Sequence, residues 1–323
     1  MAKQSNSPVE IDLDNIINKA RANFSRNEKG LGAQISTGSD IFRPTEDRHF
    51  VCWKESPWEM LVGIKGIPFG RIVQIAGRPD SGKSTHAMAF MKQAQDQGVV
   101  VILWDSESKF SANRFDNYFG GDSKKLLIVS SKLIAEGADM VNYLIDSTLS
   151  QYPDRKVLVV WDSVGGTLAK SEGDRNLRSS RQMAEASKEN GQVLRSFIHL
   201  MEKFKDKVSN EEKIAVLLIN QTYANIGAPG QKESGGQKVE YFSSIIVQLT
   251  RKSDLFRVKN KIKRKIGIVT RARVRKNHLF DGEDSIAELD LDITAGGIMI
   301  HKKSPLLESL KAGEGSGSSG DWE

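Results

Sequence analysis

Four short runs of apolar residues recur along the chain, separated by segments with helical spacing. The four runs span residues 71–76, 99–104, 156–161 and 214–219. Runs as continuously hydrophobic as these are typical of strands buried on both faces of a parallel sheet. A helical pattern follows the first run at residues 86–91, and residues 244–250 and 266–274 predict a neighbouring pair of strands. We therefore predict an α/β fold with a mostly parallel central sheet covered by helices on both faces.

The two ends of the chain differ from this central pattern. Apolar residues at helical spacing in residues 11–24 predict one helix within an N-terminal arm of residues 1–32. A helix this short is marginal in water, so we expect the arm to dock on another surface. Residues 312–323 form a Gly/Ser tract with an acidic tip, and we expect it to be disordered. Residues 33–311 are left as the folded core.

Composition and charge exclude several classes of protein. No apolar run approaches the roughly eighteen residues of a membrane span, and the N-terminus lacks the apolar core of a signal peptide. The single cysteine, Cys52, excludes an internal disulfide and a cysteine metal cluster. We therefore expect a cytoplasmic protein that makes no membrane contact. The net charge of +6 and the pI of about 9.2 are compatible with a polyanionic partner.

The segment after the first apolar run carries the most specific chemistry. Residues 77–84 match the phosphate-binding pattern G-x-x-x-x-G-K-[ST], between a predicted strand and a predicted helix. We expect this loop to bind the phosphates of ATP through its backbone N–H groups, with Lys83 at the β- and γ-phosphates and Ser84 as a ligand of Mg²⁺. A glycine-rich turn before an amphipathic helix is the alternative, and the flanking pattern disfavours it. The candidate nucleotide-binding residues are Gly77, Arg78, Pro79, Asp80, Ser81, Gly82, Lys83, Ser84 and Thr85.

Polar residues follow each of the other three apolar runs, where open α/β sheets place their sites. Asp162 could hold Mg²⁺ opposite Ser84. Asp105 and Glu107 are both candidates for the general base that activates a water, and the sequence does not choose between them. Gln221 could contact the γ-phosphate or the attacking water, or it could be structural.

Two polar stretches downstream of these strands are candidate contacts for a phosphate backbone. Residues 170–181 hold four basic residues, Lys170, Arg175, Arg178 and Arg181. Residues 222–236 are rich in glycine and read as a long loop, a kind of segment that is usually functional or disordered. Flexible backbone beside basic groups suits nucleic acid, and two solvated loops are the alternative.

Basic residues are also dense at residues 257–265 and 271–278. The alternation from Arg271 to Arg275 places the arginines on one face of a strand. Such a face is usually solvated, but it could also supply cations to the phosphates of a neighbouring subunit, as an arginine finger does.

The order of these parts resembles the RecA family of strand-exchange recombinases, especially its compact phage members. The likeness runs from about Ile11 to Lys311 and implies a P-loop ATPase core of the RecA type with an N-terminal helical arm. It is carried by residues 35–39 and 66–73 before the P-loop, by Asp105-Ser106-Glu107, by residues 159–164, by Ile219-Asn220-Gln221 with Gly235-Gly236, and by Lys276-Asn277-His278.

The resemblance implies a role for each matching residue. Glu107 is then the catalytic glutamate, Gln221 senses the γ-phosphate, and Lys276 and His278 reach ATP across a subunit interface. The implied DNA-binding residues are Arg175, Arg178 and Arg181 in a first loop and Tyr223, Lys232, Gly235 and Gly236 in a second. The family's adenine-stacking tyrosine is absent, so Arg114 could stack there or Phe115 could substitute.

The resemblance also implies a function. We expect an ATP- and Mg²⁺-dependent enzyme that forms helical filaments on single-stranded DNA and pairs it with homologous duplex DNA, in recombination, repair and recombination-dependent replication. A single-strand-binding or mediator protein could assist it in the cytosol of a bacterium or a phage-infected host. The alternatives are a ring helicase or accessory DNA-dependent ATPase on the same fold, and a small-molecule kinase.

Overall fold

The computed structural model describes residues 49–169, 180–224, 231–259, 261–279 and 288–304. The predicted arm of residues 1–32 and the predicted tail of residues 312–323 lie outside these residues. Within the described part, no helix combines the length and apolar character needed to cross a membrane.

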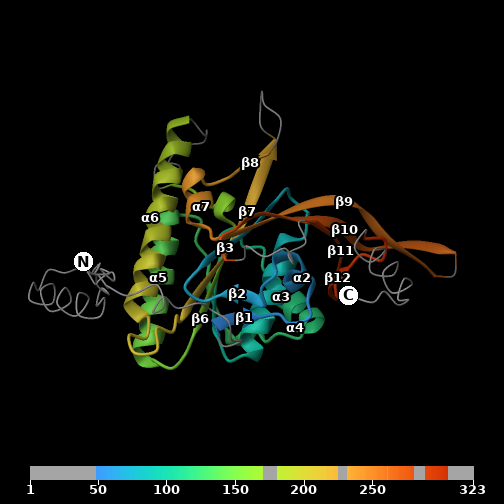
Figure 1. Ribbon diagram of the computed structural model, residues 1–323. Helices are drawn as coiled ribbons and strands as arrows, with labels where there is room; N and C mark the ends of the chain where they lie inside the picture. The colour runs from blue at the N-terminus through green and yellow to red at the C-terminus, as the bar shows by residue number, and fades with distance from the viewer. Residues whose placement is uncertain (1–48, 170–179, 225–230, 260, 280–287, 305–323) are drawn as a thin grey trace, which may run out of the picture. The chain divides into compact units, whose positions relative to one another are not determined.

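A large twisted sheet forms the centre of the described chain (Figure 1). Its strands run in the order β12-β11-β10-β9-β3-β7-β6-β4-β5, and β8 pairs with an extension of β7. In the run β9-β3-β7-β6-β4-β5, each strand is parallel to the next. The pairs β12-β11, β11-β10 and β10-β9 are antiparallel. The predicted mostly parallel sheet is therefore confirmed. Its strands are β3 (Ile72–Gly77), β4 (Val100–Asp105), β5 (Leu126–Val129), β6 (Val157–Asp162), β7 (Ile214–Ala224), β8 (Gln231–Glu233), β9 (Ile245–Lys259), β10 (Ile262–Asn277), β11 (Glu288–Thr294) and β12 (Gly297–Ile300).

Helices cover both faces of this sheet, as continuous apolar strands require. One face carries α2, α3 and α4, and the other carries α5 and α6 (Figure 1). A small separate sheet of β1 (Phe50–Cys52) and β2 (Gly66–Pro68) lies beside α3. The helices are α2 (Pro57–Val62), α3 (Lys83–Asp96), α4 (Ala112–Phe119), α5 (Ile134–Gln151), α6 (Ser180–Phe204) and α7 (Gln237–Phe242), with short 3₁₀ turns at Ser123–Lys125 and Val164–Gly166.

The alternation of side chains along each strand divides the core into two layers. On the α5 and α6 side, the fully buried Trp104 and Trp161 stack with ring centroids 4.1 Å apart. Gly137 of α5 lies directly on Trp104, where a Cβ atom would come within 2.1 Å of the indole ring. The indole N–H of Trp104 donates to the carbonyl of Ser131 at 2.9 Å, so this large side chain is buried with its polar atom satisfied.

The strand register brings the predicted site residues to one edge of the sheet. Gly77 is opposite Gln221, and Asp105 is opposite Asp162. The P-loop and the three polar segments therefore lie side by side, at the ends of β3, β4 and β6 and at Gln221 within β7. This register is a consequence of tertiary pairing, which brings together residues far apart in sequence.

Two downstream segments differ from their predicted form. The strand pair predicted at residues 244–250 and 266–274 is confirmed, but it is longer than predicted. In the basic stretch, β9 runs on to Lys259 and β10 begins at Ile262, and the two strands pair there. The segment at residues 222–236, predicted as a loop, is partly a second hairpin. In it, β7 runs on to Ala224 and pairs with β8. Backbone pairing with a neighbouring strand extends both elements beyond their apolar runs.

Candidate functional site

The P-loop lies between β3 and α3, as predicted. Gly82 adopts φ +93° and caps the helix, and a Cβ atom there would lie 2.3 Å from the side chain of Ile293. Asp80 also has a positive φ of 57°. The sharp turn at these residues leads directly into the first turn of α3, so the helix N-terminus faces the enclosed loop. Such a terminus attracts anions through its free N–H groups and dipole.

Lys83 folds back over the loop. Its Nζ donates to the carbonyl oxygens of Gly77 at 2.9 Å and Arg78 at 2.8 Å, and the residue is only 8% exposed. Burial lowers the pKa of Lys83, while the nearby carboxylates of Asp162 and Glu107 act to raise it. A phosphate group would supply the negative charge that this buried ammonium lacks.

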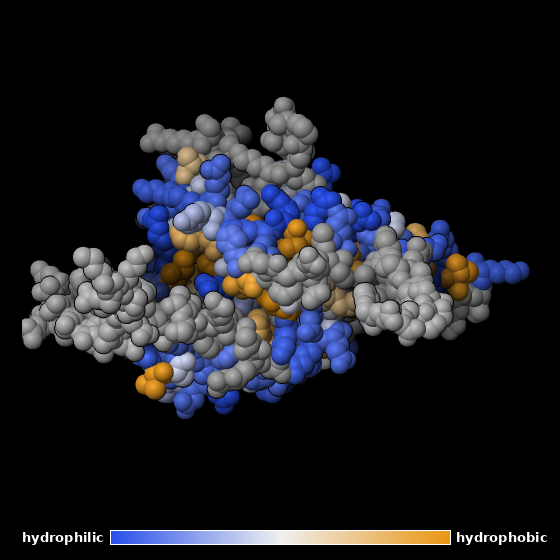
Figure 2. Space-filling model, viewed as in Figure 1, coloured by the Kyte–Doolittle hydropathy of each residue, from blue (hydrophilic) through white to orange (hydrophobic). Residues whose placement is uncertain are grey.

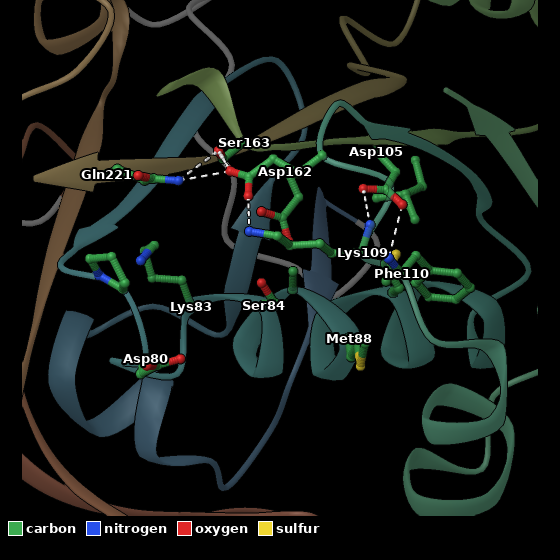
Figure 3. A pocket seen from close by; sticks show the side chains of 15 residues that line it. Asp80, Lys83, Ser84, Met88, Asp105, Lys109, Phe110, Asp162, Ser163 and Gln221 are labelled. Atoms are coloured by element: carbon green, nitrogen blue, oxygen red, sulfur yellow. Dashed lines mark hydrogen bonds and ion pairs between the residues drawn. The ribbon is translucent and has the colours of Figure 1, made fainter. Parts of the chain in front are cut away.

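A cavity of about 310 Å³ opens above the loop (Figure 3). The P-loop and α3 form one side, including Lys83 and Ser84, and the ends of the strands form the other. Met88 and Leu103 add apolar lining, so the cavity has a polar end and an apolar wall. A concave site with a few convergent polar groups is typical of a small-molecule pocket.

Asp162 at the end of β6 contacts the first turn of α3 through a hydrogen bond with Ser84. Burial raises the pKa of Asp162 to about 6. The hydrogen bond with Ser84 acts to lower this pKa, whereas the negative charges of Glu107 and Asp105 raise it further. The hydroxyl of Ser84 and this carboxylate are hard oxygen donors placed together, which suits a divalent cation. A cation here would offset both the burial and the neighbouring negative charges that raise the pKa of Asp162.

Glu107 is held by three partners at the strand ends. Its Oε1 accepts hydrogen bonds from Ser163 Oγ at 2.6 Å and from Gln221 Nε2 at 2.7 Å. Its Oε2 forms an ion pair with Lys109. Partial burial acts to raise the pKa of Glu107, but the hydrogen bonds from Lys109, Ser163 and Gln221 outweigh it and leave the pKa below its ordinary value. Glu107 is therefore ionised and oriented toward the cavity.

Asp105, the other candidate base, has a different environment. Its two carboxylate oxygens accept hydrogen bonds from the backbone N–H groups of Lys109 at 3.1 Å and Phe110 at 2.9 Å. The side chain thus closes the turn that follows β4. Asp105 borders the cavity, but its oxygens are held by backbone groups of its own turn, whereas those of Glu107 are bound by side chains that can exchange partners. The geometry therefore favours Glu107 as the reactive carboxylate.

Gln221 connects the cavity to the downstream hairpin. Its Nε2 donates to Glu107, and its Oε1 accepts a hydrogen bond from the Tyr223 hydroxyl at 3.3 Å. The backbone of Gln221 also accepts from Ser234 N at 2.9 Å, and Asn220 Nδ2 donates to the Ser234 carbonyl at 2.9 Å. One residue therefore contacts both the candidate base and the β7–β8 hairpin.

The two residues predicted to contact adenine, Arg114 and Phe115, lie in different environments. Arg114 Nη2 donates to Thr85 Oγ1 at 2.8 Å, so the guanidinium lies beside the start of α3. Phe115 is completely buried and packs against Phe110. The prediction that Phe115 could substitute for a stacking tyrosine is wrong, because its ring belongs to the core under α4.

The residues predicted to act across a subunit interface lie on β10 and just after it. Lys276 Nζ donates to the carbonyl oxygens of Glu240 at 2.9 Å and Tyr241 at 3.2 Å, at the end of α7. The His278 backbone N–H donates to the Ser244 carbonyl at 3.0 Å. Neither residue is among those that line the cavity in this chain.

Arg271 and Arg273 of β10 share a face, as predicted, and carboxylates pair with that face, whereas Arg275 lies at a register shift of the strand and pairs with Glu240 of α7. Arg271 and Arg273 both form ion pairs with Glu288, and Arg271 also binds Asp290 through Nε at 2.8 Å. Carboxylates of the same chain thus engage both guanidinium groups, which disfavours an arginine finger. The hairpin of β9 and β10 extends beyond these arginines. Figure 2 shows hydrophobic residues next to hydrophilic ones toward its far end.

Only some of the predicted DNA-binding residues can be placed. Arg175 and Arg178 lie outside the described residues, whereas Arg181 belongs to the first turn of α6 and Lys232 to β8. Tyr223 is 48% exposed. Gly235 and Gly236 have φ of +82° and +83°, and a Cβ at Gly236 would lie 2.1 Å from Ser187 Oγ. The glycine pair is therefore needed for close packing of this segment against α6.

Two residues of the site were missed by the sequence analysis. Ser163 binds Glu107 and also accepts a hydrogen bond from the Gly166 N–H at 3.1 Å. Lys109 is the ion-pair partner of Glu107. The spacing Glu-x-Lys was visible, but whether a lysine two residues from a carboxylate turns toward it depends on the backbone of the turn.

Comparison with known proteins places this architecture in a family. Residues 54–297 match the family described as RecA N-terminal domain. The chain is 31% identical over 228 residues to Protein RecA of Ureaplasma parvum serovar 3, covering 68% of this chain and 61% of that protein. It is 27% identical over 252 residues to Protein RecA of Nitratiruptor sp., covering 77% and 67% respectively. The chain thus spans about three fifths of the Ureaplasma relative, and its likeness to phage members stays a prediction.

Proposed function

Since the chain belongs to the RecA family, we propose that it is an ATP-dependent DNA recombinase whose nucleotide site is the P-loop cavity. In this proposal the chain binds single-stranded DNA, assembles head to tail into a helical filament, and pairs the strand with homologous duplex DNA. A ring helicase or accessory ATPase on the same fold is the alternative that the experiment below must separate from it.

The position of Gln221 carries the proposal. Its side chain bonds to Glu107 at the cavity and to Tyr223 at the exposed base of the β7–β8 hairpin. A change at the γ-phosphate can therefore alter the hairpin through one residue, and DNA held by the hairpin can alter the base. A physical connection between the two sites is what DNA-dependent hydrolysis requires.

The residues of the cavity can each perform one part of ATP hydrolysis. An attacking water forms a bond to the γ-phosphorus, its proton passes to Glu107, and the bond between the γ-phosphorus and the bridging oxygen breaks to leave ADP and phosphate. Lys83 and the N–H groups of the P-loop would stabilise the charge on the phosphates. Gln221 would orient the water or the γ-phosphate.

Ser84 and Asp162 would hold Mg²⁺ bound with the nucleotide. Magnesium prefers six oxygen ligands and usually takes several from water and phosphate. Two adjacent protein donors therefore suffice, and the raised pKa of Asp162 fits a carboxylate whose charge is unbalanced without a cation. The ion would neutralise negative charge that develops during phosphoryl transfer.

The partner contacts are proposed from family membership and from the placement of residues. Lys276 and His278 lie away from the cavity of their own chain, which supports a role at the cavity of a neighbour. The region of residues 170–181 and the β7–β8 hairpin, with Tyr223 exposed, would contact single-stranded DNA. A head-to-tail interface that does not close gives an open filament, and one that closes gives a ring.

The test is ATP hydrolysis with and without single-stranded DNA at two salt concentrations. We expect DNA to stimulate hydrolysis and added salt to weaken the stimulation, because phosphate contacts release counterions. Lys83→Ala is the control and should abolish turnover. Electron microscopy then distinguishes helical filaments from closed rings. Equal turnover with and without DNA would contradict the proposal and point to a small-molecule phosphoryl acceptor.

A further inference from the structure

Lys109 lies at the mouth of the cavity on a turn that is fixed by its neighbours. Both oxygens of Asp105 hold the backbone N–H groups of Lys109 and Phe110, and Ser108 takes a positive φ of 52°. The backbone of the turn is therefore pinned to the end of β4. The direction in which Lys109 leaves the chain is set by these bonds.

The side chain of Lys109 extends from this turn into the cavity. Figure 3 shows it reaching across toward Lys83, above Ser84. Its ammonium group pairs with Oε2 of Glu107, yet the side chain is 76% exposed. Burial is the main reason that the pKa of Lys83 is lowered, and the positive charge of Lys109 acts in the same direction. Two ammonium groups therefore face a common space.

We propose that Lys109 binds the γ-phosphate of the nucleotide within its own chain and, by moving there, releases Oε2 of Glu107. This inference rests on the proposed nucleotide site. In this proposal Lys109 has two positions. Its ammonium group pairs with Glu107 when the triphosphate is absent, and with the γ-phosphate when the triphosphate is bound.

The location favours the γ-phosphate over the others. Lys83 and the loop carbonyls that it contacts mark the P-loop side of the cavity. Lys109 approaches from the opposite side, where Glu107 is held by Ser163 and Gln221 at the strand ends. A phosphate that reaches this side of the cavity is the one farthest from the nucleoside.

The exchange of partners is energetically accessible. The ion pair of Lys109 with Glu107 is open to solvent on the lysine side, where the side chain is 76% exposed, and pairs that solvent reaches contribute little, about 0–1 kcal/mol. A terminal phosphate offers more negative charge and more acceptor oxygens than a single carboxylate, and charge-assisted hydrogen bonds to it are stronger than neutral ones. After the exchange, Oε1 of Glu107 keeps its bonds to Ser163 and Gln221, while Oε2 is open to a water.

The test compares triphosphate and diphosphate binding in Lys109→Met. Calorimetry with ATPγS and with ADP, each with Mg²⁺, measures the two affinities without turnover. We expect the variant to bind ATPγS about tenfold more weakly, as for the loss of one charge-assisted hydrogen bond, and to bind ADP as the wild type does. Lys109→Arg keeps the charge and should retain most of the preference for ATPγS.

Lys125→Met is the matched control. Lys125 is 75% exposed and forms a similar ion pair with Asp122, but it does not line the cavity. Its loss should change neither affinity. Unchanged ATPγS binding in Lys109→Met, or an equal loss of ATPγS and ADP binding, would overturn the inference. Failure of the wild-type chain to bind either nucleotide would overturn the proposed function itself.

Discussion

Asp105 and Glu107 stand two positions apart in the sequence and occupy different environments in the structure. The side chain of Asp105 accepts hydrogen bonds from two backbone N–H groups of the turn. Glu107 faces the cavity and contacts the side chains of Ser163, Gln221 and Lys109. Chemically similar residues thus receive a structural role and a candidate catalytic role. Their hydrogen-bond partners make the distinction.

Glu107→Gln tests the proposed base. The amide can still take part in hydrogen bonds with its neighbours but cannot accept a proton from water, so we expect hydrolysis to fall by about 10²–10⁴-fold. Binding of ATPγS should be retained or strengthened, because Lys109 loses its competing carboxylate. Steady-state turnover and calorimetry measure the two effects.

Glu202→Gln, an exposed change on α6, serves as the control for Glu107→Gln. It should leave turnover and binding unaltered. If Glu107→Gln instead abolishes nucleotide binding, Glu107 supports the shape of the site. If turnover is normal, another group is the base.

Individual helices and strands depend on contacts that local propensity does not reveal. Gly137 near the start of α5 is less favourable for a helix than alanine, but it gives Trp104 of β4 room to stack on Trp161. At the antiparallel end of the sheet, Asp290 of β11 forms ion pairs with Lys252 of β9 and Arg271 of β10. Packing and ion pairing between elements decide which residue is tolerated at these positions.

Gly137→Ala should destabilise the protein even though alanine is the better helix former. The new methyl group would come within 2.1 Å of a buried indole ring, and overpacking of this kind costs about 1–3 kcal/mol. Gly191→Ala on α6 is the matched control, because its methyl group would meet only the flexible side chain of Lys238 at 2.4 Å. We expect it to be neutral or stabilising. Urea unfolding checks both, and equal effects would contradict the packing argument.

Asp290→Asn should weaken the antiparallel edge in a pH-dependent way. Hydrogen bonds from Arg271 lower the pKa of Asp290 below its ordinary 3.8. Burial acts to raise this pKa, but a hydrogen bond from Lys252 also lowers it. The ionised carboxylate therefore stabilises the fold above pH 3.8, and this contribution is lost as the pH falls through the lower folded-state pKa. We expect the variant to lose about 2 kcal/mol at neutral pH.

Unfolding measured from pH 7 downward tests the Asp290 prediction. The difference between wild type and Asp290→Asn should shrink toward zero in strong acid. Asp254→Asn, which removes an ion-paired carboxylate that is more exposed than Asp290, should have a smaller effect. A difference that stays constant across the pH range would show that charge is not the cause.

The whole molecule is organised so that the phosphate loop, the base and the candidate DNA-binding hairpin share one edge of the sheet. Parallel pairing in register puts β3, β4, β6 and β7 side by side, with their carboxyl ends at that edge. The antiparallel strands β9 to β12 enlarge the sheet on the side of β3. A ligand in the cavity therefore contacts several strands at once and should stabilise the whole domain.

Nucleotide and metal should raise stability together. ATPγS with Mg²⁺ at about a hundred times its Kd is expected to add about 2.7 kcal/mol to the free energy of unfolding. Removal of Mg²⁺ with a chelator should reduce this gain in the wild type but much less in Ser84→Ala, which lacks the proposed ligand. Ser147→Ala on α5 should respond to the chelator as the wild type does. Thermal unfolding is the measurement, and a wild-type gain that ignores the chelator would contradict the proposed metal site.

The sequence by itself determined the class of fold, the P-loop, and the three polar strand ends at Asp105 to Glu107, Asp162 and Gln221, because these depend on local patterns and spacing. Only the tertiary structure showed the different hydrogen-bond partners of Asp105 and Glu107, placed Phe115 in the core, paired Arg271 and Arg273 with carboxylates, and turned Lys109 toward Glu107. These outcomes depend on strand register and on the partners that each side chain meets. Residues distant along the chain supply those partners, so no local pattern contains them.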